Sequence, residues 1–160
     1  MAQRRWDCQE AKGKAQVIYI LDTDVFTLCE LPDSPEYLRL HSRVLELNQE
    51  DRVVTTVVTY EEQTRGWLAY AAKSRETSHQ IKAYDRLKKH LATYLGFKVL
   101  DFDVRSAKDY DRLRHLKLAV GASDLKIAAI ALSNNATLLS RNLKDFRKVP
   151  GLEVQDWTKH

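Results

Sequence analysis

The most constraining feature of this sequence is the stretch VIYILDTDVF at residues 17–26, in which an apolar run ends in two acids. Residues 16–21 lack the polar alternation of a half-exposed strand, so they predict a strand buried on both faces, as in a parallel sheet. Asp22 and Asp24 follow at once. Ligands of open parallel sheets bind beyond the carboxyl ends of the strands, so Asp22 is expected to face such a crevice.

The rest of the chain alternates helix-like and strand-like segments. Apolar spacing and capping residues predict helices at residues 34–48, 59–75, 76–95, 104–118 and 123–135. Short apolar or β-branched runs predict strands at residues 52–58, 97–102, 136–140 and 152–157. This alternation implies an α/β fold, a three-layer α/β/α sandwich with a mostly parallel central sheet. Residues 1–15 are polar and predict an N-terminal arm ahead of one domain at residues 16–160.

Composition limits the class of protein. With 44% hydrophobic and 30% charged residues among 160, the chain has the balance of a globular domain. Its N-terminus has no signal-like apolar stretch and no run approaches the ~18 residues of a membrane span, so a cytoplasmic protein without a membrane partner is expected. Cys8 and Cys29 form no CxxC pair, which argues against structural zinc or a disulfide scaffold, although one bridge is compatible with the sequence.

The net charge of +4 is concentrated in one segment. Residues 73–89 carry six basic residues against two acids, a surplus of four that equals the net charge of the whole chain. A basic patch can hold a polyanion by displacing its counterions. The alternative is a solvated helix face with no ligand.

Further acids lie where predicted elements begin or end: Glu61, Glu62, Asp101, Asp103, Asp124 and Asp145. Carboxylates that face one crevice repel each other unless a cation neutralises them, and carboxylate oxygens suit Mg²⁺ or Mn²⁺. Each acid also has a purely structural explanation as a helix cap. Asp22 or Asp24 can cap a helix after the first strand, and Asp124 or its neighbour Ser123 can cap the helix that follows.

Four segments together resemble the PIN-domain ribonucleases of the VapC toxin type: VIYILDTDVFTLCEL, VVTYEEQTRGWL, ASDLKIAAIALSNNATLLSRNLKDF and VPGLEVQDW. The resemblance covers residues 16–157 and implies a PIN-like fold. It places the first family acid on Asp22. The second falls on Glu62, because Gly66 follows four residues later, and the third falls on Asp124, ahead of LKIAA.

The fourth polar position of the family falls within SRNLKDF, on Asn142 or Asp145, and the charge of Asp145 favours it. Ser140 stands where relatives often have Thr, and Asp24 stands where Asn is usual, which leaves a role for Asp24 in metal binding open. Asp101 and Asp103 match no catalytic position of the family and are expected to be loop or cap residues.

The resemblance implies a metal-dependent endoribonuclease that uses Mg²⁺ or Mn²⁺. Asp22, Glu62 and Asp124 would hold the ion, Asp145 would assist, and water would attack phosphorus to leave a 5′-phosphate and a 3′-hydroxyl. Basic residues, among them Arg65, Arg141 and part of the segment 73–89, would position the RNA backbone. The resemblance further implies a toxin with a small antitoxin protein as partner, and often a homodimer.

Two other readings remain open. A phosphatase of the haloacid-dehalogenase type also ends its first strand in D-x-D, but here Phe26 occupies the Thr/Val position of that motif and Thr27 comes one residue late. A non-catalytic RNA- or protein-binding module on the same fold is the second reading. The five histidines lack metal-ligand spacing and are expected on the surface or in packing, and Trp67 and Trp157 are expected in the core.

Overall fold

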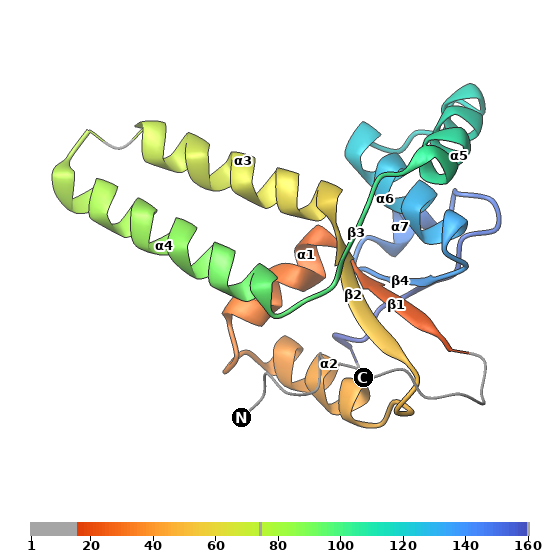
Figure 1. Cartoon of the computed structure of the whole chain (residues 1–160), viewed down its shortest axis with the longest axis horizontal. Helices are drawn as coiled ribbons and strands as arrows, with labels where there is room; N and C mark the ends of the chain where they lie inside the picture. The colour runs from red at the N-terminus through yellow and green to blue at the C-terminus, as the bar shows by residue number, and fades with distance from the viewer. Residues whose placement is uncertain (1–15, 74, 160) are drawn as a thin grey trace.

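A computed structural model describes residues 16–73 and 75–159 of the chain, so the predicted arm at residues 1–15 lies outside the described residues, as does Cys8. Strands and helices alternate along the described residues (Figure 1). In order they are β1 (Ile18–Leu21), α1 (Thr23–Phe26), the short 3₁₀ helix η2 (Thr27–Glu30), α2 (Pro35–Leu45), β2 (Arg52–Thr56), α3 (Val57–Lys73), α4 (Thr77–Leu95), β3 (Val99–Leu100), α5 (Val104–His115), α6 (Ala122–Ser133), β4 (Thr137–Leu139), α7 (Leu143–Phe146) and β5 (Val154–Gln155).

The strands form one parallel sheet in the order β3-β2-β1-β4-β5. The apolar first strand lies in the middle, where Ile20 pairs with Val54 of β2 on one side and Leu138 of β4 on the other. β1 is therefore the central strand. Hydrophobic clusters cover both of its faces, which explains why its sequence shows no polar alternation. The predicted α/β fold with a mostly parallel sheet is confirmed.

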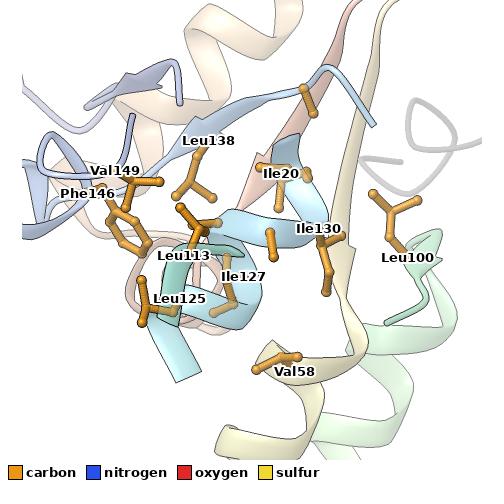
Figure 2. Close-up of a cluster of buried hydrophobic side chains, with 14 of the residues drawn as sticks. Ile20, Val58, Leu100, Leu113, Leu125, Ile127, Ile130, Leu138, Phe146 and Val149 are labelled. Atoms are coloured by element: carbon orange, nitrogen blue, oxygen red, sulfur yellow. The ribbon is translucent and has the colours of Figure 1, made fainter. Parts of the chain in front are cut away.

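The two faces of the sheet bury separate hydrophobic clusters. Ile20 points into a cluster built with α5, α6 and β4, which Figure 2 shows around Leu113, Ile127 and Ile130. Leu21 points the other way, into a cluster with α1, α2 and the end of α4. Neighbouring residues of a strand face opposite sides, so these two clusters establish the three layers.

Helices α3 and α4 form an antiparallel hairpin that extends away from the sheet (Figure 1). Its base is held by polar and aromatic contacts: the Thr64 hydroxyl lies 3.0 Å from Nε2 of His90, which stacks on Tyr60 and meets Tyr94 edge to face. No helix of residues 16–73 and 75–159 combines the length and apolar character that spanning a membrane requires.

Several boundaries differ from the predicted ones. The second strand ends at Thr56 and α3 begins at Val57, because the Thr56 hydroxyl accepts a hydrogen bond from the Thr59 N–H (3.1 Å) and starts the helix early. The prediction that Trp67 is a core residue is wrong: it lies half-buried on the hairpin, whereas Trp157 is buried as expected. His90 is a buried packing residue, as the absence of metal-ligand spacing predicts.

Candidate active site

The acids predicted to share a site follow strands that are neighbours in the sheet. Asp22 directly follows β1, Glu62 lies in the helix that follows β2, and Asp145 lies in the helix that follows β4. Parallel strands end at one edge, so these side chains emerge together, and the first turn of α6 brings Asp124 to the same place. Hydrogen bonds and electrostatic interactions between these segments confirm that they meet.

Asp22 is the most buried of the acids, with 5% of its surface exposed. Its Oδ2 accepts a hydrogen bond from the Ser140 hydroxyl (2.7 Å) and its Oδ1 accepts one from the Thr23 N–H (2.7 Å), so it also caps α1. Burial, reinforced by the nearby charge of Asp24, raises the pKa of Asp22 to about 7, although the hydrogen bonds from Ser140 and Thr23 oppose this shift. The site thus favours a proton or a cation at this carboxylate.

Asp124 lies half-buried in the first turn of α6. It does not cap the helix, which begins after Gly121 without a side-chain cap. Burial raises the pKa of Asp124, and the charges of Glu62, Asp145 and Asp24 raise it further. These three acids from other segments act on Asp124 at once, so the cluster is a shared electrostatic environment.

Glu62 and Glu61 are adjacent in sequence and have different surroundings. Glu62 is half-buried and accepts a short hydrogen bond from the hydroxyl of Thr23, one residue after Asp22. Glu61 is exposed and instead forms an ion pair with Arg65 one turn along α3. The helix therefore turns Glu62, and not Glu61, toward the end of β1.

The segment after β4 contributes both candidates for the fourth position. The Asn142 amide donates to Oδ2 of Asp145 (3.2 Å) and approaches Oδ2 of Asp124 (3.5 Å). Asp145 also accepts from Lys148 Nζ at 2.6 Å, and this hydrogen bond, together with that from Asn142, lowers the pKa of Asp145. Asn142 thus links Asp145 to Asp124, and Asp145 stands at the edge of the cluster as a neutralised carboxylate.

Asp24 is held by Arg141, whose Nε donates to Oδ2 at 3.0 Å and whose terminal nitrogen donates to the Asp24 carbonyl oxygen at 3.3 Å. The other carboxylate oxygen, Oδ1, is buried and has no hydrogen-bond partner among the described residues. Buried polar atoms are almost always partnered, so this oxygen is available to a cation.

The sequence did not identify two neighbours of the site. Thr23 connects Asp22 to Glu62 through its backbone N–H and its hydroxyl, and Lys148 neutralises Asp145. The sequence contains a signal for both residues. Thr23 stands between two acids, and Lys148 follows Asp145 by three residues, which is the spacing of an ion pair within one helical turn. Outside the site, Asp103 caps α5 by accepting from the Ser106 N–H (2.8 Å), as expected, and Asp101 is exposed in a loop.

The residues fit a divalent cation chemically. Their donors are carboxylate and amide oxygens, the ligands that Mg²⁺ and Mn²⁺ prefer. Burial and mutual repulsion raise the pKa values of Asp22 and Asp124, and a bound cation would relieve both effects. Among residues 16–73 and 75–159, no three such side chains are already gathered tightly around one point, so the ligands would have to draw closer on binding.

Comparison with known proteins agrees with this arrangement. The PIN domain family matches residues 19–152. Ribonuclease VapC1 of Haemophilus influenzae is 31% identical over 144 residues, which cover 89% of this chain and all of the relative. The tRNA(fMet)-specific endonuclease VapC of Salmonella typhimurium is 27% identical, covering 87% of this chain and 97% of the relative.

Solved structures extend the comparison to the fold. The structure of VapBC-1 from nontypeable Haemophilus influenzae aligns with a TM-score of 0.63 at 30% identity, covering 89% of this chain and 100% of that chain. FitAcB from Neisseria gonorrhoeae shares the fold, with a TM-score of 0.62 at 24% identity over 87% of this chain and 97% of that chain. The family match over most of the chain, the relatives and the parallel sheet lead to one conclusion: this chain belongs to the PIN-domain family.

Proposed function

We propose that this chain is a metal-dependent endoribonuclease and the toxin of a toxin–antitoxin pair. The observation that carries the proposal is the proximity of Asp22, Glu62 and Asp124, which come from three separate segments. The charge of Asp124 acts on Asp22, that of Glu62 acts on Asp124, and Thr23 links Glu62 to the segment of Asp22. Relatives over nearly the whole chain are ribonucleases. Clustered acids cost stability without a cation, which argues against the reading of a non-catalytic binding module.

In this proposal Asp22, Glu62 and Asp124 hold Mg²⁺ or Mn²⁺, with Asp145 and Asn142 at the outer side and Asp24 as a further oxygen donor. When bound, such an ion lowers the pKa of water and offsets negative charge on phosphorus. The product would carry a 5′-phosphate and leave a 3′-hydroxyl on the other fragment.

The neighbours of these acids position them. The Ser140 hydroxyl and the Thr23 N–H each donate to a different oxygen of Asp22, which fixes the plane of its carboxylate. The Thr23 hydroxyl holds Glu62 against the same segment. Arg141 places a cation beside Asp24, where it can contact an RNA phosphate, while Arg65 is exposed one turn along α3 from Glu61.

The proposed partners are RNA and a small antitoxin protein, and the proposed location is the cytoplasm. The aligned chain of the VapBC-1 structure, at 30% identity, is matched over 100% of its own length and covers 89% of this chain. Similarity to a chain of that VapBC structure supports an antitoxin partner. Members of this family often form homodimers, so a homodimer is included in the proposal.

The phosphatase reading would make Asp22 a nucleophile. Here both oxygens of Asp22 accept hydrogen bonds and the residue is nearly inaccessible, which disfavours in-line attack by it. Phe26, at the Thr/Val position of the phosphatase motif, is fully buried against Tyr94 with ring centroids 4.3 Å apart. Mass spectrometry of the protein after incubation with a phosphomonoester is expected to find no aspartyl-phosphate on Asp22.

The decisive test compares cleavage of RNA in Mg²⁺, in Mn²⁺ and in EDTA. Cleavage is expected only with a divalent cation, and 5′-end analysis is expected to find a phosphate. Glu62→Gln should reduce the rate at least about 100-fold, because it removes a charge from the site. Glu61→Gln is the matched control, since it changes the adjacent residue in the same helix and should cleave at the wild-type rate. Equal cleavage in EDTA, or equal loss in both variants, would refute the proposal.

A further inference from the structure

A cavity of about 260 Å³ lies between α3 and η2, and none of the acids of the cluster lines it. It is lined by Thr27, Glu30, Gln63, Gly66, Trp67 and Tyr70, a set that we call the aromatic cavity. Trp67 and Tyr70 meet edge to face with ring centroids 6.2 Å apart. None of the roles proposed above uses these residues.

The aromatic cavity begins one helical turn from the acidic cluster on both of its walls. Gly66 lies four residues after Glu62 on α3, and Thr27 lies four residues after Thr23 on the opposite wall. One turn advances about 5.4 Å along a helix. A strand with its scissile phosphate at the acids can therefore reach the cavity with a neighbouring nucleotide.

Gly66 leaves one wall of the cavity open. A Cβ built at this position meets no atom within 4 Å, so the helix presents bare backbone to the space. The hydrogen bonds from Gln63 Nε2 to Thr27 (2.8 Å) and from the Tyr94 hydroxyl to Gln63 (3.0 Å) hold the adjoining wall in place. The cavity is thus pre-formed and bounded by aromatic rings, which suits a flat apolar group such as an unstacked base.

A row of cations continues from the cavity toward the tip of the hairpin. Lys73 follows Tyr70 by three residues and Gly66 by seven, which places it on the same side of α3. On α4 the guanidinium of Arg86 lies 5.8 Å from the centre of the Trp67 ring. Lys82 and Lys89 lie four residues before and three after Arg86, on the same side of α4.

These four residues, Lys73, Lys82, Arg86 and Lys89, are exposed, and we call them the basic row. Acidic residues cancel the row only in part. Lys89 pairs with Asp85 (2.9 Å), and among residues 16–73 and 75–159 the ion pairs involve neither Lys73 nor Lys82. Glu30 lines the inner end of the cavity, but its carboxylate faces His90 Nδ1 at 3.6 Å.

We propose that the aromatic cavity and the basic row form an extended binding site for single-stranded RNA, with one unstacked base in the cavity and the adjoining phosphates along the row. The inference deepens the proposed ribonuclease function, because it names where the substrate continues beyond the acids. Aromatic stacking and a cationic track are the two components of sequence-tolerant single-strand binding. A polyanion matches the row, and the aromatic lining of the cavity matches an unstacked base better than it matches an acidic peptide.

The test measures binding of a fluorescently labelled single-stranded RNA of about 12 nucleotides in EDTA, where no cleavage complicates the reading. Gly66→Leu should fill the cavity without a clash at Cβ and weaken binding about 10-fold, as the loss of a stacked base predicts. The triple variant Lys73→Gln, Lys82→Gln, Arg86→Gln should lower the slope of log affinity against log salt by about 2, since each lost phosphate contact on single strands removes ~0.7.

Lys88→Gln is the matched control, because Lys88 lies on the side of α4 away from Lys82 and Arg86 and carries the same charge. It should bind RNA with the wild-type affinity and a slope changed by less than 0.7. Thermal unfolding verifies that each variant is folded. The inference would be overturned if the cavity and row variants bound RNA with the wild-type affinity and salt slope. It would also be overturned if these variants bound RNA normally and lost only the binding of a protein partner. If the variants lose RNA binding as expected but the wild-type protein cleaves no RNA, only the ribonuclease function is refuted.

Discussion

The acidic cluster and the α3–α4 hairpin differ in how their charges are arranged. In the cluster, carboxylates converge on one edge of the sheet, and burial with mutual repulsion raises the pKa values of Asp22 and Asp124. On the hairpin, charges are spread over an exposed surface, where Lys89 and Asp85 pair at 2.9 Å. The cluster therefore stores unfavourable energy that a ligand can release, and the hairpin does not.

The two regions also differ in what holds them. The cluster is bound to the core, since Asp22 continues the central strand and the Asp22 N–H donates to the Leu139 carbonyl at 3.0 Å. The hairpin is anchored at its base, around His90, and its outer part exposes large apolar side chains such as Ile81 and Tyr84. A rigid cluster of mutually repelling carboxylates is suited to binding a catalytic cation. A projecting surface with aromatic rings and cations is suited to binding RNA.

The largest expected effect is at Asp22. Asp22→Asn keeps the acceptor for the Thr23 N–H and a polar group beside Ser140, so the local structure should survive. Cleavage should fall at least about 100-fold because a charge that would hold the cation is lost. Melting temperature in EDTA should nevertheless rise, since the repulsion with Asp24 and Asp124 is removed. A lowered melting temperature in EDTA would show that the cluster is not strained.

The same strain predicts a pH dependence. The pKa of Asp22 is raised from 3.8 to about 7, so the folded state holds this proton more tightly than the unfolded chain. The protonated form of Asp22 therefore stabilises the fold relative to the ionised form. This stabilisation is complete below pH 4 and is lost as the pH rises through 7. The difference in unfolding free energy between Asp22→Asn and wild type, measured in EDTA, should therefore grow from near zero at pH 4 to about 2–4 kcal/mol at pH 8.

The hairpin base should respond to pH in the opposite sense. Burial lowers the pKa of His90 below 6.5, although the neighbouring Glu30 opposes the shift. The neutral form is thus favoured in the fold, and its contribution to stability is present above pH 6.5 and is lost as the pH falls. Hydrogen exchange of the α4 backbone near Tyr94 should accelerate below pH 6 relative to its intrinsic rate, while NMR should report His90 titrating below its ordinary pKa. Unchanged protection at pH 5 would contradict this.

The parallel sheet was predictable because its strands show local patterns. Residues 16–21 are apolar on both faces, which predicts a strand buried on both faces of a parallel sheet, whereas its place in the middle was not predicted and comes from the structure. The α6 segment DLKIAAIA is nearly all apolar and becomes the most buried helix, with Ile127 and Ile130 fully enclosed (Figure 2). Where sequence and structure agree, a single physical requirement, burial, decides the outcome.

The parts that the sequence did not indicate depend on contacts distant in the chain. Trp67 resembles a core residue by type, but the helix that carries it projects from the sheet and leaves the ring under Arg86. The start of α3 depends on which side chain accepts the first free N–H of the helix. The Thr56 hydroxyl does so, and the helix therefore begins two residues before the predicted start at residue 59. At the site, spacing favoured Glu62 over Glu61, but the contact of Glu62 with Thr23 arises only when β1 and β2 pair.

The smallest expected effect is at Gly66 on the hairpin, where one substitution should change both the unfolding free energy and the RNA affinity. Gly66→Ala adds a methyl group to open space within a helix, so unfolding free energy should increase by about 1 kcal/mol. Gly151→Ala is the contrasting control, because Gly151 has a φ of +77°, and the same change there should cost about 1 kcal/mol.

Urea denaturation gives both values. RNA affinity should fall slightly for Gly66→Ala and stay unchanged for Gly151→Ala, so that the more stable protein is the weaker binder. Such a result would mean that glycine is kept at position 66 for the access of a ligand, at the expense of helix stability. If Gly66→Ala instead binds RNA as tightly as wild type while gaining stability, the methyl group is tolerated and the cavity has room to spare beside any base.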